Sequence, residues 1–122
     1  VIRANYSNPP GHGAEVVSSI LRDSSLRQQW EGEVATMRNR INGMRSELVK
    51  ALKDHGVPGD YSFISRQRGM FSFSGLTKPQ VERLRDEYAI YVVGSGRINV
   101  AGLTPCNIDR VAECIGKVVR EA

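Results

Sequence analysis

The chain has 122 residues, 40% of them hydrophobic and 25% charged, which suits one domain with an apolar core or one piece of a larger enzyme. Its formal net charge of +4 comes from basic residues scattered among acidic ones, as in residues 82–87, so we expect a solvated surface and no nucleic-acid partner. No apolar run is long enough to cross a bilayer and residues 1–7 lack a signal-peptide pattern, so we expect a soluble chain without membrane contact.

The first part of the chain is predicted to hold an irregular segment and then a helix. Residues 1–10 are expected to be extended, because Pro9 and Pro10 disfavour helix in the residues before them. A helix follows, and Asp23 with the serines after it supplies a break and a capping side chain for the next helix. The apolar stripe of this first helix consists of Ala14, Val17, Ile20 and Leu21.

A long helix is predicted from Leu26 to about Asp54, because apolar residues recur there at steps of three and four. At about 1.5 Å per residue this helix would extend roughly 40 Å, enough to link two bodies. A coiled-coil seam is the alternative, but charge pairing beside such a seam is poor, and Gly32 and Gly43 weaken an isolated helix. We therefore favour a core-packed linking helix, whose apolar face is Leu26, Trp30, Val34, Met37, Ile41, Met44, Leu48 and Leu52.

Two strands and a helix are predicted after this long helix. Gly56 ends the long helix, and residues 61–65 and 70–74 then have the composition of strands around a turn. A helix opens at Thr77, because Gln80, three residues later, completes a capping box. This helix is expected to face the core with Val81, Leu84 and Tyr88.

The rest of the chain is predicted to form two more strands and a last helix. Residues 90–93 and 98–100 are strand-like, and Thr104 with Pro105 begins a helix, because proline is tolerated in a first turn. This order of elements favours an α+β fold with two layers, in which helices cover one face of a small sheet. The last helix should bury Ile108, Val111, Ala112, Ile115 and Val118 or Val119.

The cysteines and histidines indicate neither a disulfide nor a metal site. Cys106 and Cys114 fall in the last predicted helix at positions whose side chains point in different directions. We therefore expect free, reduced thiols and a cytoplasmic location. His12 and His55 lie far apart and do not have the spacing of metal ligands, so no metal is predicted.

Arg97 is the strongest candidate for a binding residue, because it stands between flexible glycines ahead of an apolar run. A guanidinium offers a planar fork of donors that matches a carboxylate in two parallel hydrogen bonds. Gly94 and Gly96 have no Cβ, which permits unusual backbone angles and close approach of a ligand. The alternative is a solvated arginine or a structural ion pair, which is common for arginines at strand ends.

A family resemblance rests on four stretches, which are residues 2–10, 68–77, 91–102 and 103–105. Together they resemble the C-terminal part of a class I aminotransferase that uses pyridoxal phosphate, in the aspartate and aromatic amino acid branch. The resemblance implies an α+β small domain, with a long linking helix and a small sheet covered by helices. It also implies that residues 1–25 are a remnant of the large cofactor-binding domain and that residues 26–122 form the linking helix and the C-terminal small domain.

The resemblance implies roles in substrate binding for five residues. Arg97 would bind the α-carboxylate of the substrate, and Arg3 would reach across a homodimer boundary to the distal carboxylate of aspartate or glutamate. Ser7 and Asn8 would lie beside that boundary, and Phe71 would lie near the substrate. Ordinary sheet core is the alternative for Phe71, and a turn before two prolines is the alternative for Asn8.

The chain departs from the family in lacking the groups that carry the reaction. Transamination needs a lysine that forms the cofactor aldimine, an aspartate on the pyridine nitrogen and a phosphate cradle. The lysines of this chain stand outside that context, so we predict no catalytic residue here, no bound pyridoxal phosphate and no activity of this chain alone. The intact parent would transfer an amino group between aspartate or an aromatic amino acid and 2-oxoglutarate. The lysines are Lys50, Lys53, Lys78 and Lys117.

An autonomous α+β binding module, for RNA in particular, is the alternative function. Residues 68–73 are faintly similar to an RNA-recognition strand with exposed aromatic side chains. A partner aromatic strand is absent from the sequence, and the order of elements differs. A structural domain without a ligand is a third possibility, favoured if Arg97 is held in an internal ion pair.

Overall fold

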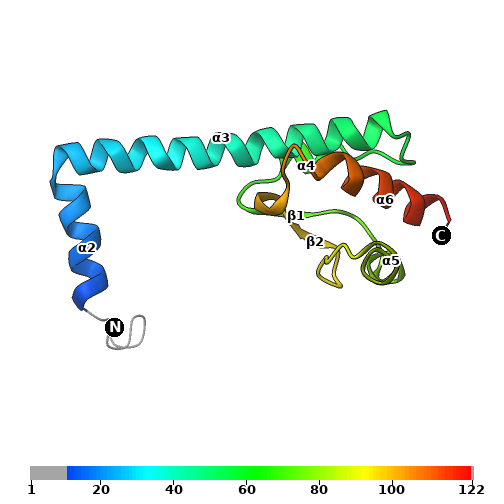
Figure 1. Ribbon diagram of the computed structural model, residues 1–122. Coiled ribbons are helices and arrows are strands. Elements are labelled where there is room, and N and C mark those ends of the chain that lie inside the picture. Colours follow the sequence, from blue (N-terminus) through cyan, green and yellow to red (C-terminus); the bar gives the residue numbers. More distant parts are fainter. Residues whose placement is uncertain (1–10, 122) are drawn as a thin grey trace. The chain divides into compact units, whose positions relative to one another are not determined.

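The computed structural model describes residues 11–121, which fall into two units divided between Arg38 and Asn39. Figure 1 shows the order of the helices and strands along the chain. The predicted extended segment at 1–10 lies outside the described residues. The division of the chain at residue 25 into a remnant of the large domain and a small domain stays a prediction.

The first unit contains α2 (Gly11–Arg22) and the beginning of α3 (Ser24–Asp54). Asp23 separates these helices, as predicted, and its Oδ1 accepts hydrogen bonds of 2.9 Å from the backbone N–H groups of Ser25 and Leu26. Because the first N–H groups of a helix have no partner within it, this carboxylate stabilises the start of α3.

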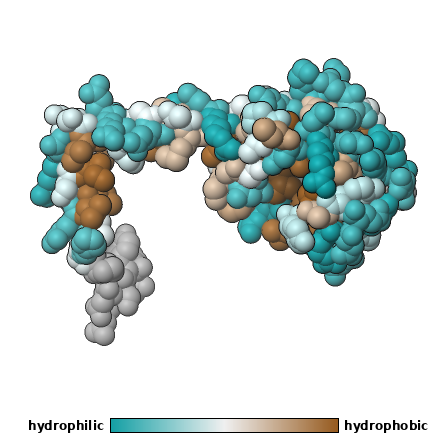
Figure 2. Space-filling view, viewed as in Figure 1, coloured by the Kyte–Doolittle hydropathy of each residue, from teal (hydrophilic) through white to brown (hydrophobic). Residues whose placement is uncertain are grey.

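Apolar side chains of the first unit lie on its surface. Figure 2 shows them gathered along α2, where no residue is buried. The side chains of the predicted stripe on the first part of α3 are exposed as well, since the described part of this unit contains no second layer to cover them. The exposed apolar residues are Val16, Val17, Leu21, Leu26, Trp30, Val34 and Met37.

The second unit has a core built mainly by three helices. The later part of α3 packs into it, together with α5 (Lys78–Tyr88) and α6 (Ile108–Arg120). The prediction of a core-packed helix is therefore confirmed for this part of α3. The fully buried side chains include Leu48, Leu52, Leu84, Val100 and Val118.

A small antiparallel sheet lies beside these helices. It consists of β1 (Phe71–Phe73) and β2 (Arg97–Asn99), with Ser72 opposite Ile98 in the register. The predicted strands are thus present, but the one at 70–74 is shorter than predicted and the one at 98–100 is shifted by one residue. The α+β class is confirmed, in a unit that is mostly helical with one two-stranded sheet.

The start of α5 follows the predicted capping pattern. The backbone N–H of Thr77 donates to Oε1 of Gln80 at 2.9 Å, and Pro79 occupies the first turn, where its missing N–H costs little. Val81 and Leu84 are buried as expected, and Tyr88 is half-buried. Local capping chemistry therefore determines where this helix begins.

The predicted strand at 61–65 is wrong, because these residues include the short helix α4 (Phe63–Arg66). Asp60 accepts hydrogen bonds from the backbone N–H and the hydroxyl of Ser62, at 2.8 and 2.9 Å. These bonds turn the backbone before a strand can extend. The apolar residues of the segment serve the core instead, since Ile64 is buried.

The predicted strand at 90–93 is also wrong. Ile90 and Val92 pack against the core, but the sheet of the described residues consists of β1 and β2 and does not include this segment. Across a turn, the Val93 N–H donates to the Arg97 carbonyl at 3.3 Å, and the Val93 carbonyl accepts from the Gly96 N–H at 2.7 Å. A β-branched composition favours packing on a half-buried surface. This segment packs in that way without belonging to a β-sheet.

The last helix begins later than predicted. Residues Val100–Gly102 form the 3-10 helix η1, and the chain then turns before α6 starts at Ile108. In that turn the Thr104 N–H donates to Oδ1 of Asn107 at 2.8 Å. The Thr104 carbonyl also accepts from the N–H groups of Asn107 and Ile108, at 3.1 and 3.0 Å, so a tight turn at Thr104 and Pro105 precedes the regular helix.

The two cysteines are free thiols in different surroundings. Cys106 is exposed in the turn before α6, so its predicted place in the helix is wrong, whereas Cys114 is buried on α6. Burial raises the pKa of the Cys114 thiol above its ordinary value. Among residues 11–121, no helix is both long and apolar enough to cross a membrane.

Candidate functional site

The outer face of the sheet carries the candidate binding residues. Successive side chains of a strand point to opposite faces, so buried Ser72 marks the inner face of β1 and Phe71 and Phe73 lie on the outer face. Arg97 is opposite Phe73 in the register and lies on the same outer face. The sheet therefore brings a cation and two aromatic rings together on one surface.

Arg97 and Phe71 are in direct contact. The guanidinium carbon lies 4.7 Å from the centroid of the Phe71 ring, which is the distance of a cation–π interaction. Phe71 is 44% exposed, so ordinary sheet core does not describe its surroundings. The ring supports one face of the guanidinium and leaves its in-plane N–H donors for a ligand.

The charge of Arg97 has no carboxylate partner among residues 11–121. The ion pairs of the described part of the chain join other residues. An internal ion pair, which would favour a domain without a ligand, is therefore not seen there. The arrangement leaves a cationic group with planar donors on a partly apolar surface, which suits a carboxylate.

Close packing at Gly96 fixes the backbone at the residue that precedes Arg97. This glycine has φ of +79°, and a Cβ at its position would lie 2.8 Å from the Leu76 carbonyl oxygen. Its own carbonyl accepts from the N–H and the buried hydroxyl of Ser74, at 2.9 and 2.7 Å. The prediction singled out Gly94 and Gly96 alike, but Gly94 has open space around it, so only Gly96 is required by the packing.

Behind the sheet lies Arg45 of α3, which the sequence reasoning missed. Only 2% of this residue is exposed, and its guanidinium is hydrogen-bonded to the segment that leads into β1. Nε donates to the Ser72 hydroxyl at 3.2 Å, and Nη2 donates to the Phe71 carbonyl at 3.1 Å. Nη1 donates to the Gln67 carbonyl at 2.8 Å, and Nη2 also donates to the Gly69 carbonyl at 2.5 Å.

A sequence signal for Arg45 exists. It comes four residues after Ile41 and three before Leu48, so a charged residue occupies the apolar face of the long helix. Burial lowers the pKa of Arg45 below its ordinary value, with the nearby charge of Arg68 acting in the same direction. An arginine on a buried helix face must find hydrogen-bond acceptors. Its position on the apolar face therefore predicts that its guanidinium is hydrogen-bonded within the protein.

Three of the four lysines are held in ion pairs, which does not suit covalent attachment of a carbonyl cofactor. Lys50 pairs with Asp54 at 2.5 Å and Lys117 with Glu113 at 2.8 Å, and these hydrogen bonds raise the pKa of both lysines. Lys78 is paired with Glu82 at 3.8 Å. A nucleophilic lysine needs a neutral amine and hence a lowered pKa, so Lys50 and Lys117 are held in the wrong state.

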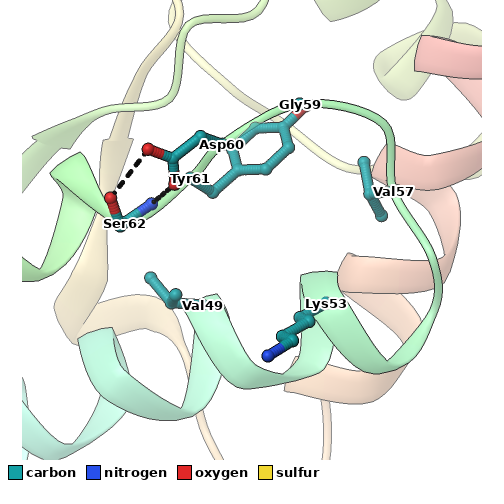
Figure 3. A pocket seen from close by; sticks show the side chains of 7 residues that line it. All are labelled: Val49, Lys53, Val57, Gly59, Asp60, Tyr61 and Ser62. Atoms are coloured by element: carbon teal, nitrogen blue, oxygen red, sulfur yellow. Dashed lines mark hydrogen bonds between the residues drawn. The ribbon is translucent and has the colours of Figure 1, made fainter.

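Lys53 lines a hollow of about 500 Å³ at the end of α3, shown in Figure 3. The Asp60 carboxylate on its rim is already bound by Ser62, which lowers the pKa of Asp60, and burial raises the pKa of Tyr61. No other cation converges with Lys53 in that lining, and neither Arg97 nor Phe71 belongs to it. Within the described residues no cluster of metal ligands exists either.

Three of the predicted site residues lie outside the described part of the chain. Arg3, Ser7 and Asn8 belong to residues 1–10, so their roles stay predictions. Of the other two, the structure places Arg97 and Phe71 in contact on one face of the sheet.

Comparison with known proteins identifies the family. The family model described as "Aminotransferase class I and II" matches residues 1–115, which is most of the chain. The chain belongs to this family. Its α+β unit with the Arg97 and Phe71 contact is therefore part of an aminotransferase fold.

Relatives with two substrate names are similar to this chain. It is 56% identical over 118 residues to an aspartate aminotransferase of Escherichia coli, covering 97% of this chain and 30% of that protein. It is 52% identical over 113 residues to an aromatic-amino-acid aminotransferase of Pseudomonas aeruginosa, covering 93% of this chain and 28% of that protein. Similarity thus extends to both branches of the predicted resemblance.

A solved structure agrees with the described fold. The aromatic-amino-acid aminotransferase of Burkholderia pseudomallei, covalently bound to pyridoxal phosphate, superimposes with a TM-score of 0.88 at 52% identity. The match covers 97% of this chain and 30% of that one. The chain therefore spans about 30% of the length of the relatives it matches.

Proposed function

We propose that the intact protein containing this chain transfers an amino group between aspartate or an aromatic amino acid and 2-oxoglutarate, and that this chain supplies the carboxylate-binding part. The observation that carries the proposal is the outward-facing Arg97, supported by the ring of Phe71 and without a carboxylate partner in the described residues. Similarity to aspartate and to aromatic-amino-acid aminotransferases supports the substrate class.

Arg97 would hold the α-carboxylate that every amino acid and 2-oxo acid substrate shares. Two parallel N–H donors of a guanidinium fix both the place and the orientation of such a group. The Phe71 ring keeps water from one face of the guanidinium, so the attraction is less screened than on an open surface. Binding in this way positions the substrate and involves no covalent step by this chain.

Arg3 would select the second carboxylate of a dicarboxylic substrate. In this proposal the intact protein is a homodimer, Arg3 enters the partner's site, and Ser7 and Asn8 lie beside the subunit boundary. The proposal for these residues rests on the family resemblance of residues 2–10 alone. The cytoplasmic location of the enzyme stays a prediction.

Pyridoxal 5'-phosphate would be held by the rest of the intact protein, since the ion-paired lysines here do not fit it. When bound, this cofactor supplies an electron sink for the bonds at the substrate Cα. The chain by itself would have no transaminase activity. Its contribution is to bind the substrate and to close over it, which excludes water.

The alternative of an RNA-binding module has less support. Its predicted recognition strand does carry exposed Phe71 and Phe73, but the sheet has only two strands in the described residues. The neighbouring strand β2 consists of Arg97, Ile98 and Asn99 and offers no aromatic ring on which a base could stack.

Steady-state kinetics of the intact protein test the proposal. Arg97→Ala should raise KM for aspartate, tyrosine and 2-oxoglutarate alike, by about 100-fold, since each loses a charge-assisted bidentate contact. Arg85→Ala is the matched control, because Arg85 is exposed on α5 and pairs with its neighbour Asp86. Unchanged kinetics of Arg97→Ala with all three substrates would refute the assignment.

A further inference from the structure

Arg45 is a buried cation that is compensated by neutral groups. Its hydrogen-bond acceptors are three backbone carbonyls and the hydroxyl of Ser72, and no carboxylate pairs with it among residues 11–121. Burying a charge in this way is costly, and apolar replacements of buried ionic groups often leave a protein equally stable. Stability alone therefore does not explain why an arginine stands here.

The hydrogen bonds of Arg45 act on the residues that carry the candidate site. Phe71 is held from both sides, because its carbonyl accepts from Arg45 behind the sheet and its ring contacts Arg97 in front. The next residue, Ser72, turns inward to accept from Nε of Arg45. The backbone of β1 is thus fixed directly beneath the ring on which the Arg97 guanidinium lies.

The same helix also holds the chain that follows β2. Arg40 of α3 donates from Nη2 to the Leu103 carbonyl at 2.8 Å and from Nη1 to the Ala101 carbonyl at 3.2 Å. Because Phe71 is opposite Asn99 in this antiparallel pair, Arg40 and Arg45 are attached to the same end of the sheet, where β1 begins and β2 ends. A guanidinium suits this task because its planar fork binds several acceptors in one fixed geometry.

We propose that Arg45 is a positioning residue for carboxylate recognition. By fixing the backbone from Gln67 to Ser72 it sets the place of the Phe71 ring, and the ring sets the direction of the Arg97 guanidinium. This inference rests on the proposed function of Arg97. A displacement of a binding group by about 1 Å can cost 100-fold in rate, so support of this kind is large enough to measure.

The test uses the intact protein and two changes at Arg45. Arg45→Lys keeps the charge but replaces the planar fork by a single ammonium, and Arg45→Met keeps the apolar stem without charge. Both should raise KM for 2-oxoglutarate by about tenfold while kcat changes by less than about threefold. Arg85→Met, at an exposed arginine paired with Asp86, should leave both constants unchanged. An unchanged KM in the Arg45 variants, with only a lower thermal midpoint, would overturn the positioning role.

Ser72→Ala provides a second, milder variant in case the Arg45 variants fail to fold. It removes only the acceptor of Nε and should raise KM by about twofold to threefold in the same direction. An unchanged KM in Ser72→Ala and in every folded Arg45 variant would refute the inference.

Arg97→Ala in the same assay separates this inference from the proposed function. If Arg97→Ala raises KM and the Arg45 and Ser72 variants do not, only the positioning role fails. If Arg97→Ala itself leaves KM unchanged, the proposed function fails.

Discussion

The guanidinium carbon of Arg97, on β2, lies 4.7 Å from the ring centroid of Phe71, on β1. The two side chains belong to neighbouring strands and share the outer face of the sheet, so the register of β1 and β2 creates the contact. The ring covers one face of the guanidinium, and the in-plane donors remain available. Recognition of a carboxylate by Arg97 should therefore depend on an aromatic ring at position 71.

Changing the ring at position 71 tests this dependence. Phe71→Leu removes the π face, and we expect KM of the intact protein for 2-oxoglutarate to rise about threefold to tenfold, the size of a partly exposed cation–π contact. Phe71→Tyr keeps the ring face and serves as the matched control, with KM near that of the unchanged protein. Equal KM values for the two variants would contradict a role of the ring.

Substitution at Gly96 tests the packing in front of Arg97. In Gly96→Ala the new Cβ would meet the Leu76 carbonyl oxygen at 2.8 Å with φ at +79°, so the free energy of unfolding should fall by about 1–3 kcal/mol. Gly94→Ala is the control, because nothing lies within 4 Å of a Cβ there. Thermal midpoints of the two variants give the comparison, and equal midpoints would show that the close packing is unimportant.

A pH-dependent contribution is expected from Arg83. Its Nε and Nη2 donate to the Glu87 carboxylate at 2.6 and 2.9 Å, and this bonding lowers the Glu87 pKa below its ordinary value of 4.5. A lowered folded-state pKa means that the stabilisation is present above the ordinary pKa and is lost as pH falls through the lowered value. Arg83→Met should therefore lower the thermal midpoint near pH 7 by about 1–2 °C, and this effect should shrink as the pH is lowered toward 3.

Arg110→Met is the control for this pH dependence. Arg110 donates to the Tyr88 carbonyl at 2.9 Å, an acceptor that does not titrate, so its effect should persist at both pH values. The Arg83 account fails if the two variants respond to pH in the same way.

The two thiols should differ in reactivity. Cys106 is exposed, whereas Cys114 is buried and burial raises its pKa, which reduces the reactive thiolate at neutral pH. Brief treatment with iodoacetamide should label Cys106 first, as read by peptide mass spectrometry. Faster labelling of Cys114 in the folded protein would contradict the burial described for α6.

The fold could be predicted where local patterns and packing agree. The apolar repeat at Met44, Leu48 and Leu52 and the cap formed by Thr77 and Gln80 both occur as expected. Residues 61–65 and 90–93 were misjudged because a strand needs a neighbour as well as β-branched composition. Whether a neighbouring strand is present depends on long-range arrangement, which composition does not contain.

The candidate site, like the fold, could be predicted from the sequence only in part. Arg97 and Phe71 lie in stretches with recognisable motifs, so each could be named as a candidate, whereas their contact depends on the register of β1 and β2. Arg45 could not be placed, because three of its four acceptors are backbone carbonyls, which every residue has. Only the position of its charge on an apolar helix face distinguishes it in the sequence.

The most direct test of the central claim is calorimetric titration of the intact protein with 2-oxoglutarate. If Arg97 binds the carboxylate, Arg97→Ala should weaken Kd by about 100-fold and Arg97→Lys by less, because lysine keeps the charge but not the fork. Kd values within about twofold of each other in the unchanged protein and both variants would contradict the claim.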